Sequence, residues 1–109
     1  MTIPVRKSSL SPRRNRLLQI CQQVGFGRVE SLVITDGEPA FDQPPRIVRE
    51  IKFGGENGPR QELAAADFIL KSQVVELVAF FDELQNGIID VLEIKHGLPF
   101  RVFVTEAPA

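Results

Sequence analysis

The stretch Gly27–Pro39, with the sequence GRVESLVITDGEP, decides the fold because the same pattern returns as Gly87–Pro99, GIIDVLEIKHGLP. The two stretches align without a gap at an offset of 60 residues, and they share a Gly, a Leu, an Ile, a second Gly and a Pro. Similarity at a fixed offset is typical of a fold built from repeated units. We therefore predict two equivalent halves.

The same offset relates the segments that precede the two stretches. Ser11-Pro12 is a typical helix start, and Gly25 is placed to end that helix. We expect a first helix at 12–24 and a second helix at 73–85. Their apolar positions coincide, since Leu17, Leu18, Ile20 and Val24 align with Leu77, Val78, Phe80 and Leu84.

Each repeated stretch has the pattern of a strand, a tight turn and a returning strand. Alternating β-branched residues predict strands at 28–35 and 88–95, with a last strand at 98–105. Asp36-Gly37 favours a type I′ turn, which needs positive φ at both central residues. His96-Gly97 occupies the same place in the second half, so we interpret His96 as a surface turn residue.

Two prolines set the expected strand order. In a two-residue hairpin, Pro39 faces Ile34 in a pair that exchanges no hydrogen bonds, so the missing N–H of the proline lies on the outer side. The same holds for Pro99 and Ile94. The returning strands are therefore expected at the edges of the sheet, with the first strand of each half paired at its centre.

The fold class predicted from these patterns is α+β, with two helix-hairpin (αββ) units in pseudo-duplication around a mainly antiparallel sheet. We expect a flexible basic tail at 1–10 and a single domain at 11–109. Within the domain, copy one covers about 12–42, linker strands cover about 46–71 and copy two covers about 72–105.

The linker holds one clear strand and one ambiguous segment. RIVREIKF predicts an extra strand at 46–53. Residues 62–71 fit a helix through Ala64-Ala65-Ala66, or a short strand at 66–71, and we favour the strand.

Strict alternation along the second hairpin puts apolar residues on both faces of the sheet. One face would carry Leu92, Ile94, Pro99 and Phe103, and the other would carry Ile89, Val91, Phe100, Val102 and Val104. Because a half-exposed antiparallel sheet shows one polar face, we expect the second face to be covered by a helix or by another subunit. We favour a homodimer, with Ile89, Val91, Phe100, Val102 and Val104 as the candidate self-association face.

Charge is distributed unevenly along the chain. Residues 1–28 carry a net charge of +6 and residues 29–109 carry −7. Arg13, Arg14 and Arg16 lie in the first turns of the first helix, where the macrodipole disfavours positive charge. They are candidates for binding an anionic partner such as nucleic acid. The alternative is that this arm is solvated or docks on acids such as Asp82 and Glu83.

No catalytic signature, cofactor motif or metal-ligand spacing occurs in the sequence. The one cysteine, Cys21, lies on the apolar stripe of the first helix, so we interpret it as a core residue. No apolar run reaches the ~20 residues of a membrane span, and we expect a cytoplasmic protein without cofactor, metal or membrane partner. An enzyme with dispersed carboxylates remains an open third alternative.

Residues 16–52 resemble the small, uncharacterised YezD-like bacterial family. The resemblance is carried by Leu17-Leu18, Gly25-Phe26-Gly27, the Asp36-Gly37 turn and the basic strand RIVREIKF. It implies a short helix, a strand, a turn and a return strand, and it implies no activity.

The function we predict is a small non-enzymatic interaction or regulatory module that self-associates. The alternative is a nucleic-acid-binding accessory protein that uses the arginine arm.

Overall fold

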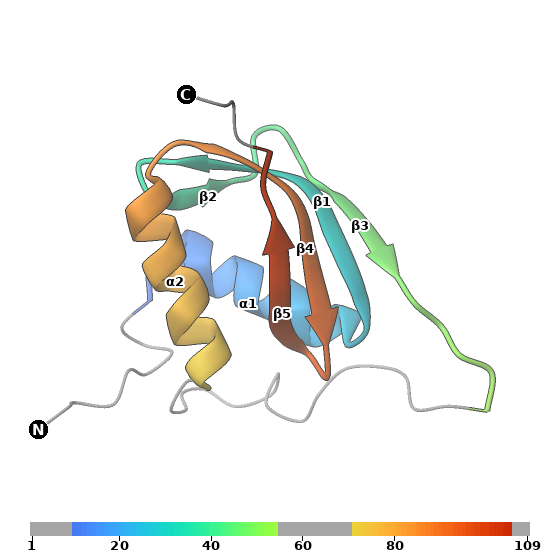
Figure 1. Ribbon diagram of the computed structural model, residues 1–109. Coiled ribbons are helices and arrows are strands. Elements are labelled where there is room, and N and C mark those ends of the chain that lie inside the picture. The colour runs from blue at the N-terminus through green and yellow to red at the C-terminus, as the bar shows by residue number, and fades with distance from the viewer. Residues whose placement is uncertain (1–9, 55–70, 106–109) are drawn as a thin grey trace, which may run out of the picture.

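A computed structural model describes residues 10–54 and 71–105 and confirms the α+β class (Figure 1). The helices and strands are, in chain order, α1 (Pro12–Val24), β1 (Gly27–Thr35), β2 (Glu38–Ala40), β3 (Arg46–Arg49), α2 (Ser72–Leu84), β4 (Gly87–Lys95) and β5 (Leu98–Phe103). β3 is shorter than the predicted strand at 46–53, and residues 62–70, where a strand was favoured at 66–71, lie outside the described residues.

The sheet has the strand order predicted from the two prolines. Its order is β2-β1-β4-β5, and β3 pairs with β1 as well. All of these pairs are antiparallel. Pro39 faces Ile34 in the first hairpin, and Pro99 faces Ile94 in the second. The returning strands β2 and β5 thus flank the central pair β1 and β4.

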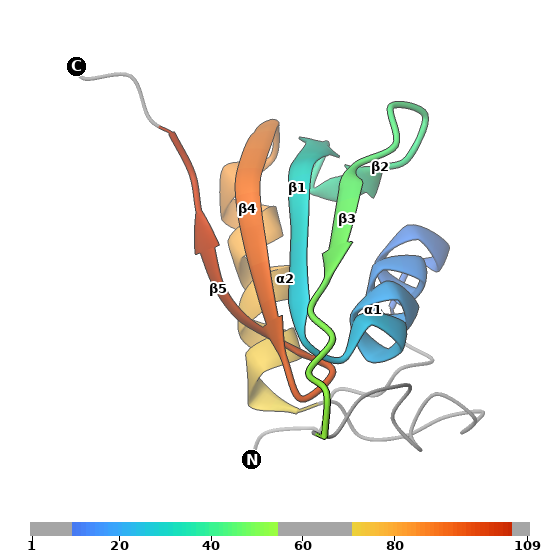
Figure 2. The ribbon, with the colours of Figure 1, turned by 90° about the vertical axis from the view of Figure 1, so that its right-hand side faces the viewer.

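Both helices pack on the same face of the sheet. One core cluster joins Leu17 and Cys21 of α1, Phe81 of α2, Val29 of β1 and Leu92 of β4. Figure 2 shows the sheet in front with α2 behind it. The opposite face, called the open face here, is not covered by either helix. Helix α2 is less deeply packed than its composition predicts, because only Val74 and Phe81 are buried along it.

Contacts between the two halves keep the offset of 60 residues. The N–H of Gly37, in the first turn, donates to the carbonyl of Gln85 at 2.7 Å, and the N–H of Gly97, in the second turn, donates to the carbonyl of Gly25 at 2.8 Å. Gly25 and Gln85 each follow the last residue of a helix and have φ of 73° and 60°. Each turn is therefore held by the helix end of the other half. That the halves are copies of one unit stays a prediction.

The alternation of buried residues is interrupted in β1, β4 and β5; in β4, Ile89 and Leu92 are three residues apart and both fully buried. Ser31 has a φ of 57°, in the left-handed region, and Val29 and Leu32, three residues apart, are both fully buried. In β5, Arg101 pairs with Glu93 while Pro99 pairs with Ile94, so a bulge leaves Phe100 as the extra residue. A bulge reverses which face the following side chains take.

The predicted faces of the second hairpin are therefore wrong. Phe103 was expected beside Leu92 and Pro99, but it pairs with Val91 and is 48% exposed, whereas Val102 pairs with Leu92 and packs against the core. The physical reason is the bulge, which strict alternation does not include.

Candidate functional site

Strand β5 is an edge strand within the part of the chain that the structure describes. Its first half is protected against further pairing, because Pro99 has no N–H and the bulge at Phe100 distorts the strand. The end of β5 at Val102 and Phe103, and Val104 directly after it, contain neither a proline nor a bulge. Main-chain groups at this end of β5 are available to another strand.

The open face of β5 carries two exposed aromatic rings. Phe100 is 51% exposed and Phe103 is 48% exposed. The Arg101 guanidinium lies between them, 5.4 Å and 5.2 Å from the two ring centroids, and Nζ of Lys95 lies 4.1 Å from the centroid of Phe100. Arg101 also forms an ion pair with Glu93 on β4. Stacked cations restrain the rings while leaving apolar surface exposed.

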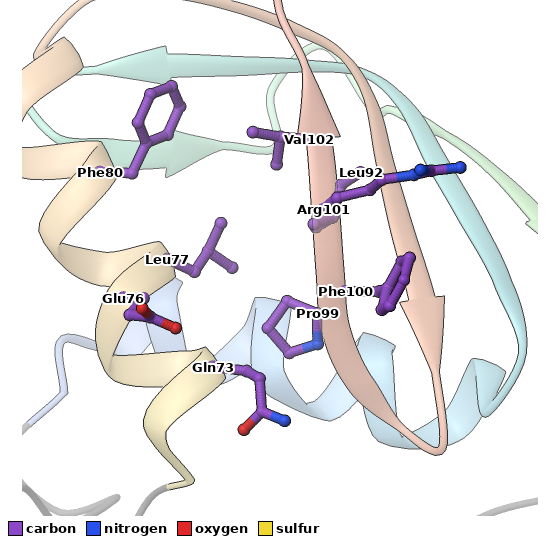
Figure 3. A pocket seen from close by; sticks show the side chains of 9 residues that line it. All are labelled: Gln73, Glu76, Leu77, Phe80, Leu92, Pro99, Phe100, Arg101 and Val102. Carbon is purple, nitrogen blue, oxygen red and sulfur yellow. The ribbon is translucent and has the colours of Figure 1, made fainter.

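On the helix side, an apolar groove separates β5 from α2 (Figure 3). Its volume is about 230 Å³. Leu77 and Phe80 project from α2, Pro99 and Val102 line the β5 side, and the polar side chain of Glu76 lies along the helix wall. Strand β5 thus has aromatic rings on one face, an apolar groove on the other and unpaired main-chain groups at its edge.

The five residues predicted as a self-association face do not lie together. Ile89 is fully buried in the core, and Val102 and Val104 pack against that core from the helix side. Val91 pairs with Phe103 and is half-buried, and Phe100 is exposed on the open face. The bulge and the irregular centre of β1 and β4 account for this separation, because they shift the alternation on which the prediction rested.

The three arginines of the first helix have different surroundings. Arg13 and Arg16 are exposed. Arg14 is only 16% exposed, and its Nη2 donates to Oδ1 of Asp82 at 2.6 Å and to the carbonyl of Gly37 at 2.8 Å. Docking on an acid was the alternative that the sequence left open, and it applies to Arg14.

Cysteine and histidine are common catalytic residues, but Cys21 and His96 both occupy structural positions in this fold. Cys21 is fully buried, and this burial raises the pKa of its thiol to about 12, against a smaller lowering effect of a backbone hydrogen bond. His96 has a φ of 55° in the second turn, and its ring meets Phe26 edge-on at a centroid distance of 4.9 Å. Both sequence interpretations, a core cysteine and a turn histidine, are confirmed.

Within 10–54 and 71–105, no group of three or more His, Cys, Asp and Glu side chains is placed to hold a metal ion. No helix in these ranges is long and apolar enough to cross a membrane.

Comparison with protein-family models, with curated proteins and with solved structures found no match to this chain. The resemblance of residues 16–52 to the YezD-like family stays a prediction. The geometry of β5 and its surroundings is therefore the basis for the function proposed for this protein.

Sequence reasoning missed the groove beside β5. Leu77 and Phe80 were assigned to a deeply packed helix, yet both are only half-buried. A signal was present, because the apolar positions of α2 span more than half of its circumference. One face of a sheet covers a narrower stripe of a helix than that, so part of the apolar surface had to remain at the rim.

Proposed function

We propose that this protein is a small non-enzymatic interaction module that self-associates into a homodimer through the β5 end of its sheet. The observation that carries the proposal is the pair of exposed rings, Phe100 and Phe103, on an edge strand whose second half is unprotected. Exposed apolar residues that cluster at one place mark interaction surfaces more often than scattered ones do.

The charges around this surface suit a second copy of the same chain. Arg101 is paired with Glu93, and Thr105 donates a hydrogen bond to Asp90. Because Arg101 is paired with an acid of its own subunit, two identical surfaces can meet without strong repulsion between their arginines. The cytoplasm is the compartment we assign, because a single cysteine cannot form the internal disulfide typical of small secreted domains.

The test is multi-angle light scattering of the wild-type protein at two concentrations at least tenfold apart, together with two variants. Phe103→Glu places a charge in the proposed interface. Ile47→Glu is the matched control, because Ile47 is 49% exposed and lies on β3, which pairs with the opposite edge of β1. We expect a dimer for the wild type and for Ile47→Glu.

For Phe103→Glu we expect dimerisation to weaken about tenfold or more, since a buried charge at an interface costs at least 1.4 kcal/mol. A wild type that is monomeric at both concentrations would contradict the proposal. A dimer that Phe103→Glu leaves intact would move the interface to another surface.

The arginine arm supports the second candidate, a nucleic-acid-binding accessory protein. Arg13 and Arg16 are exposed on the first turns of α1, whereas Arg14 is held by Asp82. Its test is a gel shift at low and moderate salt that compares the wild type with the Arg13→Ala, Arg16→Ala double variant. Equal shifts, or no shift in either, would dismiss this candidate.

A further inference from the structure

The pairing register of the second hairpin determines which main-chain groups of β5 are unpaired. Lys95 and Leu98 flank the two-residue turn, so they form a hydrogen-bonded pair. Main-chain groups of successive residues in a strand point alternately to its two sides. Those of Lys95 point towards β5, so those of Leu92, three residues earlier, point towards β1. Val102 faces Leu92. Its N–H and C=O consequently point away from β4, towards solvent at the free edge.

The same alternation applies two residues further along. Phe103 pairs with Val91, whose main-chain groups point towards β5. The N–H and C=O of Val104 therefore point outward, like those of Val102. The free edge offers two donors and two acceptors at the spacing that an antiparallel strand requires.

We infer that the occupant of this edge is β5 of a second copy, paired antiparallel about a two-fold axis at Phe103. The inference rests on the proposed self-association and specifies its interface. In this register, Val102 of one subunit forms a hydrogen-bonded pair with the partner's Val104, and the reciprocal pair forms on the other side of the axis. The two sheets then join into one continuous sheet.

Among the described residues, other symmetric registers make fewer bonds. An axis at Val102 would leave one hydrogen-bonded pair, because the next pair would need the N–H of Phe100, which the bulge directs towards β4. An axis at Phe103 uses both donors and both acceptors of Val102 and Val104. It is therefore the register that satisfies the most main-chain groups among the described residues.

The side chains fit the same arrangement on both faces. Phe103 lies opposite the partner's Phe103 in a non-hydrogen-bonded pair, where cross-strand side chains are closest and aromatic pairs stabilise a sheet. On the helix side, the partner's Val104 lies next to Val102 at the groove formed by Leu77 and Phe80. Arg101 faces the partner's Thr105, so no like charges are opposed.

A disulfide cross-link distinguishes this register from other modes of contact. Phe103→Cys places two thiols opposite each other at a Cα separation of ~4.5 Å, within the range of disulfides. Phe100→Cys is the matched control, because it lies on the same strand and face with nearly the same exposure, 51% against 48%. With the two-fold axis at Phe103, the two Phe100→Cys residues of the dimer would lie six positions apart along the paired strands, or ~20 Å.

The readout is the fraction of covalent dimer on non-reducing gels after mild oxidation at micromolar protein. Cys21 does not interfere, because it is fully buried. We expect at least tenfold faster cross-linking for Phe103→Cys than for Phe100→Cys. Equal rates in a protein that light scattering shows to be a dimer would overturn the register and leave self-association standing. A monomeric wild type would remove both.

A proline variant tests the hydrogen bonds themselves. Val104→Pro removes the outward N–H just beyond the last residue of β5, and Val104→Ala controls for the lost side chain. We expect Val104→Pro to dissociate the dimer and Val104→Ala to keep it. A dimer that survives Val104→Pro would place self-association on another surface and would overturn the inference.

Discussion

Arg14 in the first turn of α1 is bonded to Asp82 in α2, with Nη2 and Oδ1 2.6 Å apart. The same nitrogen donates to the carbonyl of Gly37 in the first turn, and Nε lies 2.8 Å from Oε2 of Glu38 as an ion pair. One side chain therefore joins both helices to the first hairpin. The nearby acids offset the unfavourable effect of the α1 macrodipole on a positive charge.

Arg14→Ala is expected to destabilise the fold by about 1–3 kcal/mol, because it removes the bonds of a side chain that is only 16% exposed and deprives the partly buried carbonyl of Gly37 of this donor. Arg13→Ala is the control, since Arg13 is exposed on the same turn and should change stability by less than about 0.5 kcal/mol. Urea unfolding followed by circular dichroism measures both. Equal effects of the two variants would show that Arg14 does not join the helices in solution.

Gly27→Ala is expected to detach β3 from β1. Gly27 has a φ of 155°, and a Cβ atom there would lie 2.1 Å from the carbonyl oxygen of Val48 on β3. Since main-chain atoms cannot yield as a side chain does, we expect a loss of about 1–3 kcal/mol and faster amide exchange at the residues of β3. Gly87→Ala, at the aligned position of β4, is the control because its Cβ meets only the side chain of Leu84, at 3.2 Å. If both variants behave alike, β3 does not approach β1 this closely.

Cys21 is expected to be unreactive in the folded protein. A thiol with a pKa of about 12 is almost entirely protonated at pH 8, and its burial also blocks reagents. Titration with an aromatic disulfide reagent should therefore detect one thiol after denaturation and essentially none before. Rapid reaction in native buffer would show that α1 separates readily from the sheet.

Glu30 is expected to titrate below the ordinary glutamate value of about 4.3. Arg28 is the main cause, because its Nε donates to Oε2 of Glu30 at 2.6 Å, with smaller contributions from its charge and from that of Arg46. The pKa of Glu30 should rise in Arg28→Ala and stay unchanged in Arg49→Ala, as measured by carboxyl carbon NMR.

The sign of the pH effect follows from the lowered pKa of Glu30. Its contribution to folding stability is present above the unfolded-state pKa and is lost as the pH falls through the folded-state value. Arg28→Ala should therefore lose stability relative to the wild type near neutral pH and approach it in acid. A difference that is constant with pH would contradict this assignment.

The strand order could be predicted because it depends on local chemistry. Pro39 and Pro99 lack an N–H wherever they stand, so each must lie on an edge. Strict alternation could not predict the faces of β5, although the sequence contains one residue, Arg101, that does not fit the alternating pattern. On the helix-covered face assigned to Pro99 and Phe103, alternation also places Arg101 between them, and burying an unpaired arginine is costly. The bulge at Phe100 moves that charge to the open face.

The sequence by itself determined the ends of α1, both tight turns and the central pairing, since these follow from steric and hydrogen-bonding preferences of neighbouring residues. Only the tertiary structure decided that Arg14 meets Asp82, that both helices share one face, and that Phe103 is exposed beside an unpaired edge. These features join residues far apart in the chain, and they depend on how packing redirects a strand at Ser31 and Phe100, which no local preference specifies.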